Sequence, residues 1–115
     1  MKIIVCGGRD FTDCEFVFAA LDHFNKKHPV SLVIEGGAKG ADAIGALWAK
    51  HNKIDCWKVT ADWDKHGKAA GHIRNRLMLD LEPDAVIAFP CGKAAANMVQ
   101  QATAAGVKIW QPKYK

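Results

Sequence analysis

The sequence has no closely spaced pair of cysteines and no long apolar run. Its four cysteines are far apart in the chain, at Cys6, Cys14, Cys56 and Cys91. Without a C-x-x-C pair, neither a zinc ribbon nor a disulfide-stapled scaffold is indicated, and we expect reduced, mostly buried thiols. We accordingly expect no metal and no cofactor.

The apolar segments are also too short for a membrane span or an export signal. The first ten residues, MKIIVCGGRD, reach glycine after only four consecutive apolar side chains, which is fewer than a signal peptide needs. No later run approaches the length of a transmembrane helix. These absences predict a cytoplasmic protein without a membrane partner.

Charge of one sign is not in large excess either. Sixteen Lys and Arg residues against twelve Asp and Glu residues give a net charge of +4. That charge favours anionic ligands but is too small for a nucleic-acid-binding tail or a polybasic membrane anchor. The length of 115 residues and the hydrophobic content of 50% suit one compact domain, residues 1–115.

The sequence does contain a regular alternation of short apolar runs and longer helix-length segments. Strand-like runs occupy residues 2–6, 31–35, 55–59, 84–89 and 107–110, and the segments between them occupy 13–26, 39–51, 66–81 and 93–105. The alternation predicts an α/β fold, a Rossmann-like three-layer domain whose five-stranded parallel sheet has helices on both faces. We expect the strand order 3-2-1-4-5.

Glycine-bearing loops follow three of the predicted strands. They are CGGRD after the first, EGGAKGAD after the second and PCGKAA after the fourth. In the expected order these loops border one crevice at the carboxyl ends of the strands, where open α/β sheets bind their ligands. We therefore predict a site for an anion or a nucleotide, although tight structural turns also need glycine. The loops match neither the Walker A pattern nor G-x-G-x-x-G, which argues against an ordinary P-loop NTPase or NAD enzyme.

Two side chains near these loops have both a structural and a functional interpretation. Asp42 lies in the first turn of the second predicted helix, where its charge either complements the helix dipole or accepts hydrogen bonds from ribose hydroxyls or a bound water. Trp63 follows the third strand and either stacks on a base or covers the core. We expect the other tryptophans, Trp48, Trp57 and Trp110, to be packing residues.

Arg74 has the same ambiguity on the third predicted helix. It shares a helical stripe with Ala70, Leu77 and Leu81. A guanidinium among apolar neighbours is suited to bidentate capture of phosphate or carboxylate, and equally to an internal ion pair. On the exposed side of the same helix, Arg76 is placed to pair with Asp80, four residues on.

Four blocks of the sequence, GGRDFTD, GGAKGAD, ADWDKHGKAAGHIRNRLM and AFPCGKAAANM, resemble the YspA-type, YpsA-related branch of the SLOG superfamily. This superfamily also includes the DprA/SMF proteins and the LOG cytokinin-activating hydrolases. The resemblance covers almost the entire chain, and it implies a Rossmannoid fold with a site for nucleotides or nucleotide-derived small molecules. By position, the residues that fall on the family's motif are Gly7, Gly8, Arg9, Gly36, Gly37, Gly40, Asp42, Arg74 and Asn75.

The chain departs from the superfamily at the loop after the fourth strand. Residues 90–95 read P-C-G-K-A-A where SLOG members typically read P-G-G-x-G-T, so two flexible or hydroxyl-bearing positions that would cradle phosphate are lost. Lys93 either supplies a point charge there or is an exposed lysine that serves solubility. Met98 occupies the position of the catalytic glutamate of LOG-type hydrolases, so the resemblance does not imply their activity.

The favoured function is a module that binds or senses a nucleotide-derived ligand. A hydrolase that uses the same pocket is the second hypothesis, with Asp42 the best catalytic candidate ahead of Glu35, Asp62 and Asp64. DprA-like binding of single-stranded DNA is the third, and it is not favoured because no clear aromatic and basic stripe is visible. The sequence leaves a homo-oligomer open. The predicted ligand-binding residues are Gly7, Gly8, Arg9, Gly36, Gly37, Ala38, Lys39, Gly40, Asp42, Trp63, Arg74, Asn75, Pro90, Gly92 and Lys93.

Overall fold

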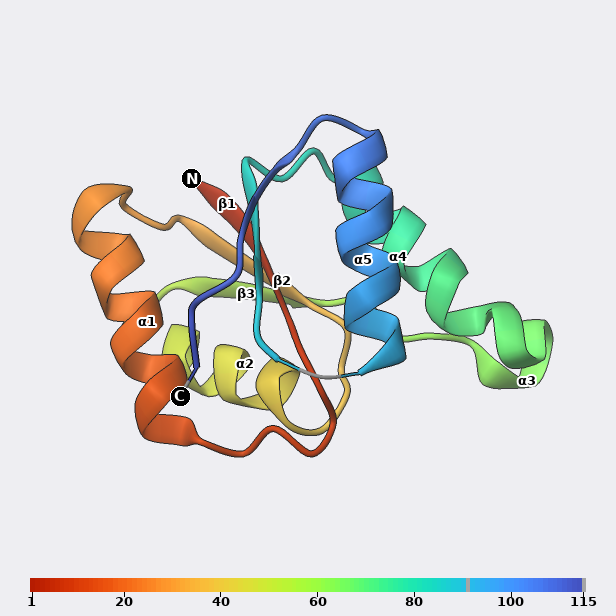
Figure 1. The fold of residues 1–115 in the computed structure, drawn as a ribbon, viewed down its shortest axis with the longest axis horizontal. Coiled ribbons are helices and arrows are strands. Elements are labelled where there is room, and N and C mark those ends of the chain that lie inside the picture. The colour runs from red at the N-terminus through yellow and green to blue at the C-terminus, as the bar shows by residue number, and fades with distance from the viewer. Residues whose placement is uncertain (91, 115) are drawn as a thin grey trace.

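Five parallel strands form the centre of the molecule. The computed structural model describes residues 1–90 and 92–114. Its strands are β1 (Lys2–Cys6), β2 (Leu32–Glu35), β3 (Asp55–Lys58), β4 (Ala85–Ala88) and β5 (Lys108–Trp110). They form one sheet in the order β3-β2-β1-β4-β5, with every neighbouring pair parallel (Figure 1). This confirms the predicted fold class and strand order.

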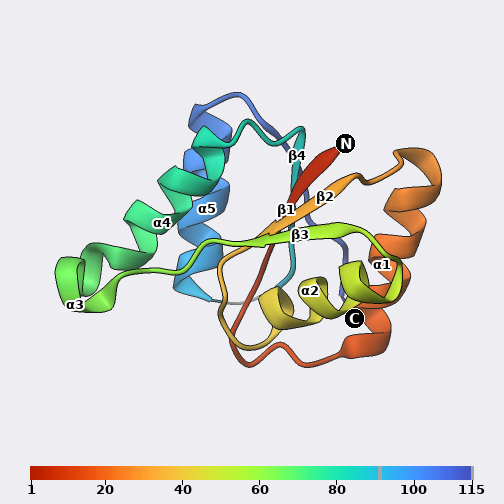
Figure 2. The same cartoon turned by 180° about the vertical axis from the view of Figure 1, so that it is seen from behind.

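Helices cover both faces of the sheet. On one face lie α1 (Cys14–Lys27) and α2 (Ala41–His51), and on the other lie α4 (Ala70–Asp80) and α5 (Lys93–Ala104) (Figures 1 and 2). No helix among the described residues is long and apolar enough to cross a membrane.

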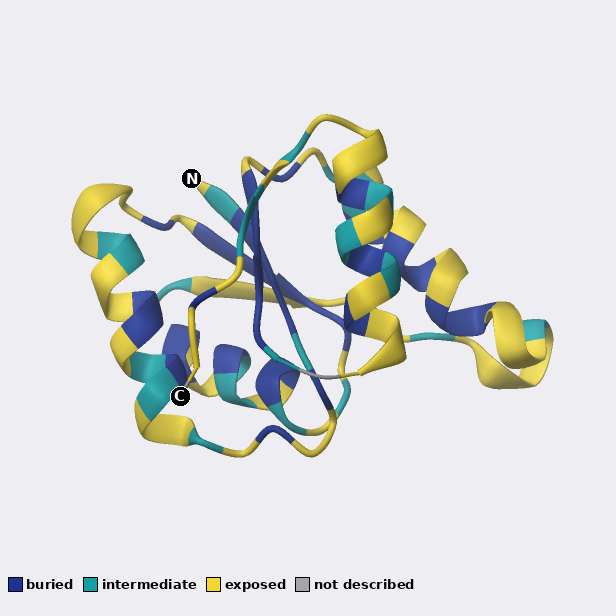
Figure 3. Ribbon diagram, viewed as in Figure 1, coloured by how far each residue is buried: buried dark blue, intermediate teal, exposed yellow. Residues whose placement is uncertain are grey.

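The central strands are apolar at nearly every position because both of their faces are covered. Ile3 and Val5 of β1 join the core under α1 and α2, whereas Ile4 and Cys6 join the core under α4 and α5. β1, β2 and β4 are mostly buried, while the edge strand β3 is exposed along its whole length (Figure 3).

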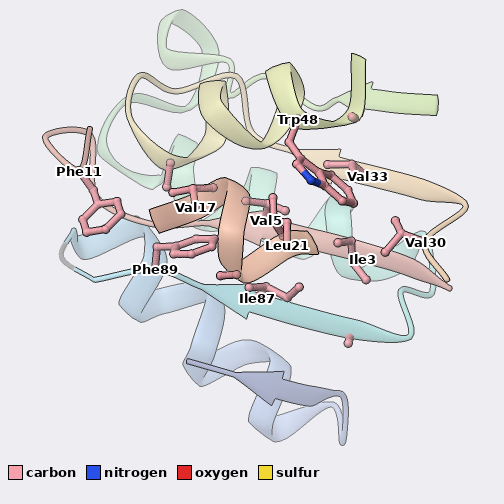
Figure 4. Packing of buried hydrophobic residues seen from close by; sticks show 14 residues of the cluster. Ile3, Val5, Phe11, Val17, Leu21, Val30, Val33, Trp48, Ile87 and Phe89 are labelled. Atoms are coloured by element: carbon pink, nitrogen blue, oxygen red, sulfur yellow. The ribbon is translucent and has the colours of Figure 1, made fainter. Parts of the chain in front are cut away.

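Trp48 anchors the core beneath α2. Its side chain is fully buried near Val33 (Figure 4), and its Nε1 donates a hydrogen bond to Asp22 Oδ1 at 2.8 Å. The packing role predicted for Trp48 is confirmed, and Trp110 also packs, partly buried, against this core. The prediction for Trp57 was wrong, because that residue lies on the uncovered edge strand and is 52% exposed.

The segment between β3 and β4 is not the uniform helix predicted over residues 66–81. It contains a short helix α3 (Trp63–His66), a 3-10 turn η1 (Gly67–Ala69) and then α4. The Asp62 side chain caps α3 by accepting from the Lys65 amide at 3.1 Å, and α3 ends at Gly67, whose φ is 56°. Trp63 therefore begins a helix, and α3 extends away from the sheet (Figures 1 and 2).

The stripe predicted on this helix is only half correct. Ala70 and Arg74 are buried, as expected, but Leu77 is 51% exposed and Leu81 is only partly buried. The buried face of α4 is instead completed by Gly71, Asn75 and Met78. Asn75 is buried because its side chain donates hydrogen bonds to α5. A pattern of apolar residues does not predict the burial of a polar side chain. The Arg76–Asp80 pair is present, at 3.7 Å.

The cysteines are less buried than predicted. Cys6 is buried, but Cys14 and Cys56 are exposed. Cys14 begins α1 and Cys56 belongs to the exposed edge strand β3, so neither has a layer of side chains above it. Cys91 lies outside the described residues.

Candidate functional site

The three glycine loops are joined to one another by backbone hydrogen bonds. The Gly8 amide donates to Pro90 O at 3.0 Å, and the Ala41 amide donates to Gly8 O at 3.4 Å. Gly40, whose φ is 79°, lies so close to the first loop that a Cβ there would be 2.7 Å from Arg9 O. The first loop is thus held between the other two, at the carboxyl ends of the strands.

A cavity of about 650 Å³ lies where these loops meet α4 and the β3–α3 segment. Its size is within the usual range for sites that bind small molecules. The cavity is lined by Cys6, Gly7, Arg9, Gly36, Gly37, Ala38, Lys39, Asp42, Thr60, Ala61, Trp63, Arg74, Asn75, Met78, Gly92, Lys93, Ala94 and Ala95.

Most of the predicted ligand-binding residues line this cavity, and three do not. Gly8, Gly40 and Pro90 lie outside the lining, where they form the joints between the loops. Sequence reasoning missed several lining residues, among them Thr60, Ala61 and Met78. Thr60 and Ala61 lie in the loop after β3, which ends at Lys58. The rule that ligands bind at the carboxyl ends of the strands therefore identifies them when it is applied to every strand and not to glycine loops only.

The first two amides of the β2–α2 loop are already occupied by the protein's own carboxylates. The Gly36 amide donates to Asp42 Oδ2 at 3.1 Å, and the Gly37 amide donates to Glu35 Oε1 at 2.6 Å. Backbone N–H groups in glycine loops usually serve as anion-binding donors. Because these two donors are satisfied internally, this part of the wall offers acceptors to a ligand.

Arg74 closes the floor of the cavity through polar contacts with uncharged groups. Its Nη1 donates to Gly36 O at 2.8 Å, and its Nε donates to Asn75 Oδ1 at 3.1 Å. Within the described residues the only ion pair is between Arg76 and Asp80, so the internal ion pair considered for Arg74 is not formed there. Asn75 in turn donates to Ala94 O at 2.9 Å. This chain of hydrogen bonds connects the loop after β2 with α4 and α5.

Gly36 lies between Arg74 and Asp42 with no space for a side chain. A Cβ at this position would be 2.7 Å from Arg74 Cζ and 2.9 Å from Asp42 Oδ2. We expect Gly36→Ala to lower the free energy of unfolding by about 1–3 kcal/mol, because both charged groups would have to move. Urea denaturation measures the change.

The matched control for this substitution is Gly71→Ala. Gly71 is also buried beside the cavity wall, but it lies within α4, and a Cβ there would only touch the Trp63 ring at 3.7 Å. Because alanine is the better helix former, we expect this change to be neutral or stabilising by up to about 1 kcal/mol. Equal destabilisation by the two substitutions would contradict the close packing around Gly36.

Burial raises the pKa values of the two carboxyl groups that bond to the β2–α2 loop, those of Asp42 and Glu35. It raises the pKa of Asp42 to about 6, although the nearby Arg74 charge and the Gly36 amide act in the opposite direction. Burial also raises the pKa of Glu35. Glu35 Oε2 is buried and has no hydrogen-bond partner among the described residues. Glu35 at the end of β2 and Asp42 in the first turn of α2 therefore both ionise less readily than exposed carboxyl groups, and of the two only Asp42 lines the cavity.

Cys6 and Met98 are both chemically inert in this arrangement. Burial, assisted by the Asp42 charge, raises the pKa of the Cys6 thiol to about 12, so it is not a nucleophile at neutral pH. Met98 is fully buried in the core under α4 and α5 and does not line the cavity. Its thioether thus neither takes a proton nor faces a ligand.

The exposed part of the cavity lining is cationic. Arg9, Lys39 and Lys93 line it and are exposed, and Trp63 lines it with 59% of its surface accessible. Lys93 begins α5 directly after the N-cap residue Gly92, so the first amides of that helix lie at the cavity wall without intrahelical acceptors. The cavity therefore combines a buried carboxylate, Asp42, with several exposed basic side chains.

The fold and the position of this cavity define a Rossmann-like α/β domain with a ligand-sized site at the carboxyl ends of its strands. The profile of the YspA, cpYpsA-related SLOG family (YAcAr) matches residues 1–66. The chain is also 34% identical, over 116 residues, to the Gene 61 protein of Mycobacterium phage D29, covering 94% of this chain and 93% of that protein. The chain belongs to the YspA, cpYpsA-related SLOG family. No solved structure gave a significant match.

Proposed function

We propose that the cavity at the carboxyl ends of the strands binds a nucleotide or a nucleotide-derived small molecule. One observation carries the proposal: a single cavity joins the buried carboxylate of Asp42 to an exposed rim of Arg9, Lys39, Lys93 and Trp63. Such a cavity complements a molecule with hydroxyl donors at one end, an anionic group at the other and an aromatic ring. Nucleotides combine all three.

The internal hydrogen bonds suggest how such a ligand is oriented. The Gly36 amide is committed to Asp42, so phosphate is disfavoured at the β2 wall, and ribose hydroxyls are the better donors to Asp42. Phosphate is better accommodated at the first turn of α5 beside Lys93, with Arg9 and Lys39 nearby. The base then stacks on the exposed face of Trp63.

A thermal-shift panel of chemically distinct nucleotides tests the proposal. It would contain nucleoside mono- and diphosphates, cyclic nucleotides, ADP-ribose and NAD. A ligand at 100 times its Kd is expected to stabilise the protein by about 2.7 kcal/mol, which raises the Tm by several degrees for a domain of this size. Mass spectrometry of small molecules released when the purified protein is denatured provides an independent readout. A panel with no response and a protein with no released nucleotide would contradict the proposal.

Hydrolysis of a nucleotide derivative in the same cavity is the second candidate. The specific observation in its favour is Asp42, which lines the cavity and whose pKa of about 6 suits proton transfer near neutral pH. Glu35 stands beside the same loop but does not line the cavity. Under this proposal Asp42 is the general acid or base.

We also propose that the protein works in the cytoplasm, as expected from its sequence.

The particular reaction of LOG-type enzymes is not expected. Met98 is buried away from the cavity, so no carboxylate stands at that position of α5. We expect AMP incubated with the protein to yield no free adenine above the uncatalysed background, as measured by liquid chromatography. Release of adenine in proportion to protein concentration, lost in Asp42→Ala, would show that Asp42 had taken over the missing role.

A further inference from the structure

A second cavity, of about 340 Å³, lies at the opposite end of the sheet from the first. It is formed where β1, β4 and β5 begin, between the last turns of α1 and the edge strand β5. None of its lining residues belongs to the first cavity. They include His23, Phe24, Lys27, His28, Lys108 and Trp110.

The charged groups of this second cavity are basic. Lys27 and Lys108 line it together with two imidazoles, and none of the described lining residues is an Asp or Glu. Asp22 and Asp84 adjoin the lining in the chain but do not line the cavity. Asp22 accepts a hydrogen bond from Trp48 Nε1, and Asp84 accepts one from the Lys2 amide. The last carbonyls of α1 oppose an anion, and the charges of Lys27 in that turn and of Lys108 at the start of β5 act in the opposite direction.

Aromatic rings form the apolar part of the same cavity. The rings of Phe24 and Trp110 are nearly parallel, at 20°, with centroids 6.2 Å apart. The imidazole of His23 lies 6.2 Å from Trp110, and that of His28 lies 5.2 Å from Phe24. Trp110 and Phe24 are only partly buried, so they contribute both to the core and to the cavity surface.

We propose that this second cavity binds one nucleotide of a single-stranded nucleic acid. The base packs against the Trp110 and His23 rings, and the flanking phosphates contact Lys27 and Lys108. Proteins that hold single strands combine aromatic stacking surfaces with cations that follow the backbone. A duplex keeps its bases stacked inside and cannot offer one to the rings. The proposal concerns a surface separate from the proposed nucleotide cavity and does not rest on it.

Fluorescence anisotropy of a labelled oligothymidine of twelve nucleotides at low salt tests this proposal. The double substitution Lys27→Glu with Lys108→Glu is expected to weaken binding at least about tenfold. The slope of log affinity against log salt concentration is expected to become shallower by about 1.4, because two phosphate contacts are lost. The matched control is Lys26→Glu with Lys50→Glu, which changes net charge equally at exposed residues outside the cavity. We expect less than about a threefold effect from the control. No binding by the wild type, or equal weakening by both double variants, would overturn the proposal.

A second pair of variants tests the stacking surface. Trp110→Phe keeps an aromatic ring, whereas Trp110→Leu keeps apolar bulk but loses the ring. We expect Trp110→Leu to weaken the oligothymidine at least about fivefold relative to Trp110→Phe. Urea denaturation of both variants identifies any loss of fold. Equal affinities in two folded variants would overturn the stacking of a base on Trp110.

Three further titrations distinguish other occupants. A duplex of equal length or a polyglutamate peptide that binds as tightly as the single strand would show a general polyanion surface. Thymidine monophosphate that binds as tightly would show a site for free nucleotides. Loss of strand binding in Ala94→Glu, which changes only the first cavity, would place the strand there. Each of these results would overturn the proposal, and a clear preference for the single strand in all three supports it.

Discussion

Replacing Arg74 by alanine is expected to lower the free energy of unfolding by about 3–5 kcal/mol, because two hydrogen bonds from a buried charged donor are lost at about 1.5–3 kcal/mol each. The guanidinium is 6% exposed and donates to Gly36 O and Asn75 Oδ1. Its removal leaves these acceptors without a donor and takes the nearest stabilising charge from the buried Asp42 carboxylate. Urea denaturation of the unliganded protein at pH 7.5 measures the change.

The control for Arg74 lies two residues further along the same helix. Arg76 is 75% exposed and pairs with Asp80 at 3.7 Å on the surface, where an ion pair contributes little. We expect Arg76→Ala to change the free energy of unfolding by less than about 0.5 kcal/mol. If Arg74→Ala were as mild as Arg76→Ala, Arg74 would be a ligand-binding residue without the structural role that its hydrogen bonds indicate.

Asp42→Asn is expected to stabilise the protein at neutral and alkaline pH. Burial raises the pKa of Asp42 from an ordinary value of 3.8 to about 6, so the folded state binds a proton more tightly than the unfolded state. Between these two values the folded state holds more protons, and stability must therefore fall as pH rises. The destabilising contribution is absent below about pH 4 and complete above about pH 6. The difference of roughly two pKa units corresponds to about 3 kcal/mol.

The asparagine variant removes this titration and keeps an oxygen that can accept from the Gly36 amide. We expect Asp42→Asn to exceed the wild type by about 2–3 kcal/mol at pH 8 and to match it near pH 4. Asp64→Asn, an exposed carboxylate outside the cavity, controls for the loss of a negative charge. A variant less stable than the wild type at pH 8, or a difference that does not depend on pH, would contradict the cost assigned to Asp42.

A carboxylate that lowers stability and faces a cavity is the pattern of a residue retained for function. Buried charges usually have ion partners, and functional sites are where proteins tolerate such costs. If Asp42→Asn gains stability and loses ligand binding, both effects have one cause. The result would also distinguish the proposed ribose-binding role of Asp42 from a helix-dipole role, since the latter predicts lower stability in the variant.

The fold could be predicted from the sequence because its signals are local and repeated. Short apolar runs separated by helix-length segments leave few arrangements other than a parallel sheet covered on both faces. The α3 segment escaped this reasoning because its helix is one turn long and is set by one cap at Asp62 and one glycine at Gly67. The exposure of Trp57 escaped it as well, because β3 is an edge strand that no helix covers.

The residues around the first cavity could be predicted, but their hydrogen bonds could not. Strand-end loops identify Gly36 and Asp42 as neighbours of one crevice, whereas only the three-dimensional structure shows that the Gly36 amide donates to Asp42. The glycine pattern predicted backbone amides that donate hydrogen bonds to an anion. Because of this bond, that part of the loop instead offers hydrogen-bond acceptors to a ligand. The second cavity was not visible at all, because its residues come from segments as distant as His23 and Trp110.

The most direct test of the proposed function is calorimetric titration of the panel nucleotides into two variants of α5. Ala94 lies in the first turn and lines the cavity, whereas Ala96 is exposed on the same helix and does not line it. A glutamate at Ala94 repels phosphate at the proposed position, while the same change at Ala96 alters only the charge. We predict that at least one nucleotide derivative binds the wild type and Ala96→Glu alike, and binds Ala94→Glu at least about tenfold more weakly. Equal affinity for all three proteins, or no binding to any, would contradict the account.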